Sequence, residues 1–402
     1  MGQSALNEAA VPHIHDDPFS IPFLDNPYPH YEKMREAGPL VYLPQYQCYA
    51  VARHDDVQTV LSDWETFSSA AGVGLANFNT ESPWRPRSIV LEVDPPMHTR
   101  TRTVLTRALS PVNVRKMREQ FEREAEALVD RALEMGELDG IADFSEIYPV
   151  KVFPDALGLN SEGRENLLPY GNMVFNSFGP RNALTDAAFI NGDKVRSWIM
   201  ANCTREALSK DGLGAQIYSA IETGELTAEE APLLIRSFLS AGVDTTVNAF
   251  GNMLWCLARF PDQWAKLRAN PALARPAFDE LLRYEGPAQV FFRTTTRDVD
   301  FHGQNIPANE KIAAYMGSAN RDPRRWEAPD MFDVERRATG HMGLGTGIHG
   351  CVGQAVARLE AEAVFTAFAR KVASIELTGE PVRHYNNVLR SLKSLPLRLT
   401  PA

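Results

Sequence analysis

The chain has 402 residues, 44% of them hydrophobic, so it can bury a large core in one large domain or two fused ones. Its 41 Lys and Arg against 51 Asp and Glu give a formal charge of −10, which argues against binding to nucleic acid or to an anionic membrane. No apolar run is long enough to span a bilayer and the N-terminus lacks a basic-then-apolar leader, so we expect a soluble, cytoplasmic protein. The cysteines are scattered without zinc or Cys-x-x-Cys spacing, which argues against a disulfide framework and a structural metal.

The predicted elements begin with a polar N-terminal segment. Residues 1–26 contain proline and predict an extended arm. The runs 40–43 and 49–52 are strand-like and flank a turn, which predicts a small sheet. Helical patterns dominate from about residue 97 to 285, so the sequence predicts a mainly α protein with a minor β portion. The later β-like pieces are 291–296, 298–301, 311–315 and 391–399.

The longest predicted helix covers residues 227–260, where Thr227-Ala-Glu-Glu230 forms a capping box and Pro261 stops the periodic pattern. Roughly 30 residues would span about 45 Å, enough to cross a domain. Its middle, residues 241–246, contains Gly, Asp and Thr, which have low helix propensity in a helix interior. Threonine hydroxyls there can also donate a hydrogen bond to a backbone carbonyl of the preceding turn and bend the helix. Either packing or function explains such a bend. Ala241 and Thr245 share one face of the helix.

A glycine-rich loop, residues 341–353, opens directly into a predicted helix over 354–369. Glycine lets the backbone approach a flat ligand because it has no side chain. Cys351 lies at the N-terminus of this helix, where free amide hydrogens and the helix dipole favour thiolate over thiol. A buried thiolate suits an iron ligand, whereas a lone cysteine in a tight turn is more often a plain free thiol.

The loop resembles, position for position, the proximal loop of the cytochrome P-450 haem-thiolate monooxygenases. One departure is Leu344, where the family usually has Phe. The stretch 241–246 resembles the oxygen-activation groove of that family, and its Ala/Gly-Gly-x-Asp/Glu-Thr pattern is complete. The resemblance implies one P-450 domain over residues 1–402, with the 227–260 helix above a haem b and the 341–369 loop and helix on the opposite face. The matching loop residues are Gly345, Gly347, His349, Cys351 and Gly353.

Further residues match the family. Glu280-Leu-Leu-Arg283 resembles its Glu-x-x-Arg pair, and the third member of that buried ionic triad would be Arg336. The resemblance makes Cys351 the iron ligand, and it makes Asp244 and Thr245 the pair that delivers protons during dioxygen activation. Buried haem propionates need cationic or hydrogen-bonding partners. The residues implied to hold the haem are His98, Arg102, Ala241, Arg293, His349, Gly345 and Gly353.

A slot lined by Phe and Leu that ends in Arg and Ser suits a flat aromatic acid. Nearly the whole chain closely resembles the bacterial P-450 subgroup that oxidises para-substituted benzoic acids, including residues 174–180 and the stretch from 236. In that subgroup residues matching Arg85, Ser88 and Ser237 hold the carboxylate and so point the para substituent at the iron. For Arg85 a structural ion pair is the alternative, and for Arg236 a supporting role. The implied substrate residues are Arg85, Ser88, Leu91, Phe175, Phe178, Arg236, Ser237, Ala241, Ala288 and Phe291.

The implied activity inserts one oxygen atom of O₂ into a para-substituted aromatic acid, as in the O-demethylation of 4-methoxybenzoate to the phenol and formaldehyde. We expect a monomer that takes electrons from a separate [2Fe–2S] ferredoxin and its NAD(P)H-dependent reductase. A peroxide-driven oxygenase on the same acids is one alternative, which the intact Asp244–Thr245 pair argues against. A haem sensor or carrier without turnover is another, and a product assay would exclude it. A globular binding protein that holds no haem is a third alternative, and its signature would be the absence of a haem absorbance band.

Overall fold

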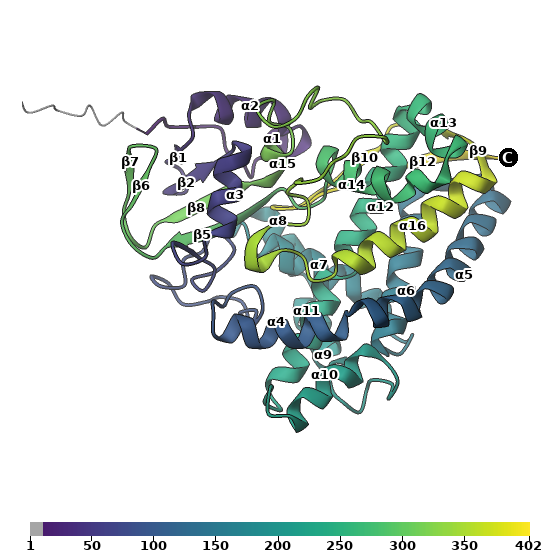
Figure 1. Ribbon diagram of the computed structural model, residues 1–402, viewed down its shortest axis with the longest axis horizontal. Helices are drawn as coiled ribbons and strands as arrows, with labels where there is room; N and C mark the ends of the chain where they lie inside the picture. The colour runs from purple at the N-terminus through teal and green to yellow at the C-terminus, as the bar shows by residue number, and fades with distance from the viewer. Residues whose placement is uncertain (1–10) are drawn as a thin grey trace, which may run out of the picture.

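The structure is a computed structural model that describes residues 11–402, and it is mainly α-helical with a smaller β part (Figure 1), as the sequence predicts. The N-terminal helices lie beside the main sheet, and the other helices form the larger part of the molecule. The helices are α1 (Ile21–Asp25), α2 (Tyr28–Ala37), α3 (His54–Ser62), α4 (Met97–Ala108), α5 (Pro111–Met135), α6 (Ile147–Leu157), α7 (Leu167–Asn176), α8 (Ala183–Ala188), α9 (Gly192–Asn202), α10 (Leu213–Glu222), α11 (Glu230–Ala241), α12 (Asp244–Arg259), α13 (Pro261–Ala269), α14 (Ala274–Tyr284), α15 (Met316–Ala319) and α16 (Gln354–Lys371).

The main sheet joins segments that lie far apart in the sequence. Its strands follow the order β1-β2-β8-β5-β3. β2 runs parallel to β8, with Ala50 opposite Ala313, and the other neighbours are antiparallel. The strand-like runs predicted at 40–43, 49–52, 291–296 and 311–315 therefore meet in one sheet, whereas the run predicted at 298–301 belongs to a separate two-stranded sheet. Its strands are β1 (Val41–Leu43), β2 (Cys48–Val51), β3 (Phe67–Ser68), β5 (Val290–Thr295) and β8 (Lys311–Tyr315).

The remaining strands form smaller sheets. The predicted C-terminal strand or hairpin at 391–399 is divided between two of them, because β11 pairs with β10 whereas the next strand pairs with β4 and β9. The strands are β4 (Glu137–Asp139), β6 (Val299–Phe301), β7 (Gln304–Ile306), β9 (Val372–Leu377), β10 (Val382–Tyr385), β11 (Arg390–Ser394) and β12 (Pro396–Pro401).

The N-terminal segment differs from the predicted extended arm. Residues 1–10 lie outside the described residues. From residue 11 on, the chain is held against the main sheet, because His13 pairs with Tyr42 and Ile14 N donates to Tyr42 O (2.9 Å). Residues 21–25 form α1, which buries Phe23. The expectation was wrong for this part, because isolated apolar residues such as Phe23 dock on the core and stabilise a short helix that a polar, Pro-containing sequence does not predict.

The predicted helix over 227–260 is two helices. The capping box is present, with Thr227 N donating to Glu230 Oε2 (3.0 Å) and Glu230 N to Thr227 Oγ1 (3.3 Å). However, α11 ends at Ala241 and α12 begins at Asp244. The ring of Phe153 packs closely against the break, since a Cβ at Gly242 would lie 2.5 Å from Phe153 Cε1. The residues that are weak in a helix interior therefore interrupt the helix completely instead of only bending it.

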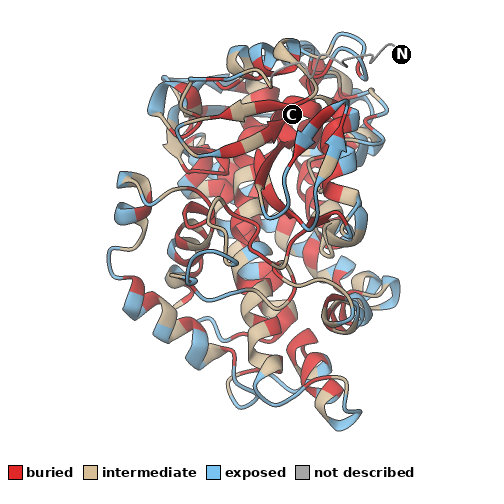
Figure 2. Ribbon diagram, turned by 90° about the vertical axis from the view of Figure 1, so that its left-hand side faces the viewer, coloured by how far each residue is buried: buried red, intermediate tan, exposed pale blue. Residues whose placement is uncertain are grey.

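Helix α16 begins after Gly353 and packs against α5 and α14, in the large apolar core that most of the helices share. Figure 2 shows buried residues through the interior and exposed residues on the outer helices. Within residues 11–402, none of the helices has the length and apolarity that a membrane crossing needs.

A buried ion cluster joins α14 to the segment that precedes the glycine-rich loop. Arg283 Nε donates to Glu280 Oε2 (2.7 Å) and Arg336 Nε to Glu280 Oε1 (3.1 Å). The side chains of Glu280 and Arg283 are fully buried. Arg283 also donates to the carbonyls of three residues of the segment, which the cluster therefore fixes on α14. These residues are Asn320, Pro329 and Met331.

Candidate active site

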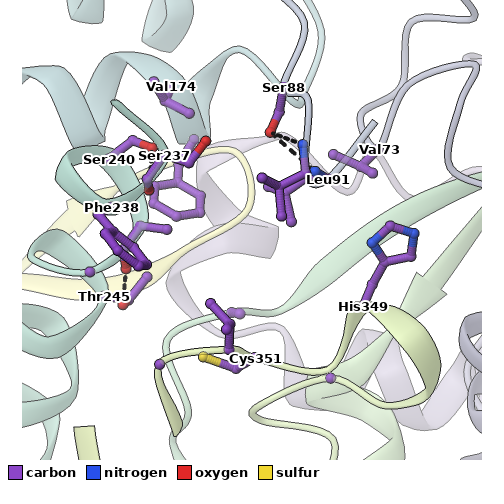
Figure 3. A pocket seen from close by; sticks show the side chains of 18 of the residues that line it. Val73, Ser88, Leu91, Val174, Ser237, Phe238, Ser240, Thr245, His349 and Cys351 are labelled. Atoms are coloured by element: carbon purple, nitrogen blue, oxygen red, sulfur yellow. Dashed lines mark hydrogen bonds between the residues drawn. The ribbon is translucent and has the colours of Figure 1, made fainter. Parts of the chain in front are cut away.

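A cavity of about 300 Å³ lies between the α11–α12 break and the glycine-rich loop (Figure 3). Residues 85–91, α7 and β5 supply further walls. Its lining is mainly apolar with a few polar groups, which is typical of a site for an organic ligand. The cavity brings together residues that the sequence places more than 200 positions apart, such as Ser88 and Cys351.

Cys351 is the cysteine that faces this cavity. The other three cysteines are buried elsewhere and do not line it. Cys351 N donates to Leu344 O (2.8 Å), which closes the loop. Gly347 has a positive φ of 65°, and a Cβ there would lie 2.8 Å from Ser62 Cα, so the tight loop requires glycine at this position.

The charge state of the Cys351 thiol differs from the expectation. Burial raises the pKa of Cys351, although the amide of Gly353 and the charges of Arg102 and Arg358 act in the opposite direction. The helix N-terminus therefore does not by itself make a thiolate here, because desolvation outweighs it. A bound metal ion does so directly, since a coordinating thiol is deprotonated.

Ala241 and Thr245 line the wall that α11 and α12 form. Thr245 Oγ1 donates to Ala241 O (2.7 Å), the back-bonding that the sequence suggested (Figure 3). Asp244 is buried outside the cavity lining, against α7, where a Cβ at Gly171 would lie 2.5 Å from Asp244 Cβ. Burial raises the pKa of Asp244 to about 7, although Asn248 Nδ2 donates a hydrogen bond (3.3 Å) that lowers it. Asp244 therefore titrates near neutral pH, and it directly precedes Thr245, which lines the cavity.

Several basic groups beside the cavity lack anionic partners. The two ring nitrogens of His349 and Nε2 of His98 are buried and have no hydrogen-bond partner among residues 11–402. The two rings lie 4.4 Å apart, with His98 behind His349 and outside the lining. Buried Arg293 donates to Phe292 O (2.8 Å) and Arg102 to Gly350 O, and neither meets a carboxylate among the described residues. Burial lowers the pKa of Arg293 to about 10.

This basic cluster fits the haem that the sequence implies. Unpaired buried cations and donors are costly unless a ligand supplies acceptors, and two propionates would supply them. The residues of the fit are Arg102, Arg293 and His349, which line the cavity together with Cys351, and His98, which lies against His349.

The end of the cavity away from Cys351 carries hydroxyl groups (Figure 3). Ser88 Oγ accepts from the amides of Val90 (3.3 Å) and Leu91 (3.1 Å), so its own hydrogen remains available to a ligand. Ser237 Oγ donates to Leu233 O (3.0 Å) and would have to release that bond to donate elsewhere. Arg236 donates to the carbonyl of Arg87 (2.9 Å) and forms no ion pair within the described part of the chain.

Arg85 also lines this end, but it is paired. Its Nη1 donates to Glu92 Oε2 (2.8 Å) and its Nη2 to Glu92 Oε1 (2.5 Å), and both side chains are buried. The guanidinium also lies over the ring of Phe178, 4.7 Å from its centroid. The structural pair that the sequence left open as an alternative for Arg85 is therefore present.

Aromatic rings form the side walls between the two ends. Phe178 contacts Phe175 and Phe291, with ring centroids 5.8 and 5.9 Å apart. Leu91 and Ala288 lie in the same lining. The candidate substrate residues named from the sequence all line the cavity: Arg85, Ser88, Leu91, Phe175, Phe178, Arg236, Ser237, Ala241, Ala288 and Phe291.

Sequence reasoning missed two acidic residues of the site. Glu92, the partner of Arg85, lies in an irregular segment where no periodic pattern indicates a contact across seven positions. Glu360 lies on the apolar side of α16, lines the cavity and has an unpartnered buried Oε2. Burial raises the pKa of Glu360. A lone Glu within the buried stripe of a helix was the signal that could have identified it.

Comparison with known proteins decides the family. Residues 204–372 match the family described as cytochrome P450. Over 395 residues the chain is 53% identical to cytochrome P450 CYP199A2 of Rhodopseudomonas palustris, covering 98% of this chain and 96% of that protein. The chain is a cytochrome P450. It is therefore an oxidoreductase with a haem whose iron a cysteine ligates, as the sequence predicted.

Solved structures agree with this assignment. Cytochrome P450 CYP109Q5 from Chondromyces apiculatus superposes on this P450 with a TM-score of 0.82 at 30% identity, over 98% of this chain and all (100%) of that one. Cytochrome P450 CREJ, in complex with (4-ethylphenyl) dihydrogen phosphate, superposes with a TM-score of 0.86 at 26% identity, over 96% and 99% of the two chains.

Proposed function

We propose that this P450 inserts one oxygen atom of O₂ into para-substituted aromatic carboxylic acids, for example in the oxidative O-demethylation of 4-methoxybenzoate. The observation that carries the proposal is a slot walled by aromatic rings, with the hydroxyls of Ser88 and Ser237 at the end away from Cys351 (Figure 3) and with Arg85 and Arg236 in the same lining. An acid bound at that end would direct its para substituent toward Cys351. The similar CREJ structure holds a para-alkylphenyl phosphate, another flat ring with an anion at one end.

Each residue has a definite role in this proposal. Cys351 would ligate the iron, Arg102, Arg293, His98 and His349 would hold the propionates, and Ala241, Gly345 and Gly353 would leave room for the porphyrin. When bound, the haem supplies the activation of dioxygen, and its thiolate ligand favours cleavage of the O–O bond. Asp244, whose pKa of about 7 suits proton exchange near neutral pH, would supply the proton, and the Thr245 hydroxyl, which lines the cavity, would pass it on.

The electron donor and the cellular setting are part of the same proposal. We assign a separate [2Fe–2S] ferredoxin with its NAD(P)H-dependent reductase as the donor, a cytoplasmic location and a monomeric state. The adjacent Asp244 and Thr245 favour O₂ over peroxide as the oxidant, because a peroxide-driven enzyme has no need to deliver protons to dioxygen.

Titration of the purified ferric protein with 4-methoxybenzoate tests the proposed substrate class. We expect a low- to high-spin shift of the Soret band as the acid enters the slot and displaces water. Anisole keeps the ring and the methoxy group but lacks the carboxylate, so it should give a much weaker shift. Equal shifts with both compounds would remove the carboxylate from the proposal, and no shift with the acid would reject the substrate class.

Thr245→Ala is expected to separate electron use from product formation. The variant loses the hydroxyl that donates to Ala241 O, while the apolar wall and the acid-binding end remain. We expect product per NAD(P)H consumed to fall about tenfold, with little change in substrate affinity. This is less than the roughly 100- to 10,000-fold that a positioned acid–base group contributes, because water in place of the hydroxyl can still supply protons. Thr245→Ser restores the hydroxyl and should restore coupling. Unchanged coupling in Thr245→Ala would exclude the proton-transfer role.

A further inference from the structure

Asn387, in the turn between β10 and β11, binds the segment that carries Phe178. Its side chain is buried, and its Nδ2 donates to Asn176 O (3.0 Å) and to Thr185 Oγ1 (3.0 Å). It also forms a reciprocal amide pair, in which Asn182 Nδ2 donates to Asn387 Oδ1 (2.9 Å) and Asn387 Nδ2 to Asn182 Oδ1 (3.2 Å). One side chain therefore contacts residues on both sides of Phe178 in the sequence.

The backbone at Phe178 is held from two directions. A Cβ at Gly179 would lie 2.4 Å from Asn387 Cβ, so the close approach of the turn requires glycine at this position. From another side, Leu75 N donates to Phe178 O (2.7 Å), and a Cβ at Gly74 would lie 2.6 Å from the same oxygen. The ring of Phe178 therefore projects into the cavity from a fixed backbone.

The chain that follows Asn387 is joined to another part of the cavity wall. Asn386 Oδ1 accepts from Leu389 N (3.1 Å), which stabilises the turn. Leu389 forms a β-bridge with Ala288, which lines the cavity and lies three residues before Phe291. This turn therefore connects two segments that supply aromatic rings to the slot, and it fixes their relative position.

We propose that Asn387 sets the regioselectivity of this P450 by acting through Phe178. By fixing that ring against Phe291, it keeps the shape of the slot in which an aromatic acid fits with its para position toward Cys351. The inference rests on the proposed function. Asn387 lies outside the cavity lining, so it is a positioning residue. Loss of its side chain would release the segment 176–182 and let the ring of Phe178 shift within the slot.

The test compares the affinities of the ferric holoenzyme for 4-methoxybenzoate and 3-methoxybenzoate, measured by optical titration. The wild type should prefer the para isomer. In Asn387→Ala this preference should fall about tenfold, less than the roughly 100-fold that a misplacement of about 1 Å can cost. Thr185→Val keeps the shape of the side chain but removes one acceptor of Asn387, so it should lower the preference about threefold.

Gln263→Ala is the matched control. Gln263 is a buried amide whose Oε1 accepts from Val334 N (3.1 Å), and neither residue lines the cavity. The control should unfold at lower urea, as Asn387→Ala should, but keep the preference within about twofold of the wild type. An equal loss of preference in the control would overturn the inference. An unchanged preference in Thr185→Val would also overturn it, even if Asn387→Ala does not fold.

Hydrogen–deuterium exchange of the holoenzyme without ligand separates failure of this inference from failure of the proposed function. The amides of residues 174–182 should exchange faster in Asn387→Ala than in the wild type, and no faster in Gln263→Ala. Unchanged exchange in Asn387→Ala would refute its hold on this segment. Faster exchange, together with no spin shift of the wild type by either isomer, would reject the aromatic acids as substrates, and with them the role of Asn387 in regioselectivity.

Discussion

Replacing Cys351 with serine is expected to abolish monooxygenase activity while leaving the protein folded. The thiol faces the cavity, and no other cysteine lines it. Loss of a residue that only orients a metal ligand typically costs 10–100-fold, so loss of the ligand itself should cost at least about 100-fold. The measurement is the absorption spectrum of the reduced protein with carbon monoxide, which reports a thiolate ligand, together with product from 4-methoxybenzoate and from a screen of other aromatic acids.

Cys203→Ser is the matched control for this prediction. Cys203 is buried at the end of α9, outside the cavity lining, and burial raises its pKa to about 12. The control should therefore keep both the thiolate spectrum and the activity. A Cys351→Ser protein that retains the thiolate spectrum would mean that another cysteine ligates the iron, and the whole arrangement of the site would have to be revised.

The features that the sequence predicted best are encoded by contiguous residues. The glycine-rich loop and α16 were found because glycine, cysteine and helix-forming residues follow one another without interruption from 341 to 371. The pair Glu280–Arg283 was identified from its resemblance to the family's Glu-x-x-Arg pair, and its contact depends only on local geometry, since two residues three positions apart on a helix are neighbours.

The features that the sequence missed depend on contacts between distant segments. The composition of residues 241–246 predicts a weak point in a helix, but the structure has a complete break there, where Phe153 packs against Gly242. The helix sequence alone does not reveal this contact, because Phe153 belongs to a distant segment. Likewise, the resemblance favoured a direct contact of Arg85 with the acid and left a structural pair as the alternative, but it did not identify Glu92, which the fold brings onto both terminal nitrogens of Arg85. Asp244 and Cys351 show that burial can outweigh local effects, because desolvation raises the pKa of both.

Glu280→Gln is expected to reduce the free energy of unfolding by about 3–5 kcal/mol, the cost of leaving a buried charge without its partner. Glu280 accepts from Arg283, Arg336 and the amide of Asp333, and its side chain is fully buried. The measurement is urea unfolding of the holoenzyme. The matched control is Glu362→Gln, which breaks the partly exposed pair between Glu362 of α16 and Arg118 of α5 (3.0 Å) and should change stability by at most about 1 kcal/mol. Equal effects of the two substitutions would contradict the expectation.

A double variant would test whether this ion cluster differs from an ordinary buried ion pair in its effect on stability. Replacing both partners of an isolated buried pair with apolar residues is often neutral, since no charge is left behind. Arg283, however, also donates to the carbonyls of Asn320 (2.9 Å), Pro329 (2.8 Å) and Met331 (2.9 Å). In Glu280→Leu/Arg283→Leu these acceptors would lose their partner, so we expect less than half of the lost stability to return. Full recovery would mean that the segment before the cysteine loop holds its position without Arg283. Partial recovery would mean that the guanidinium is retained because it organises the backbone that leads to Cys351.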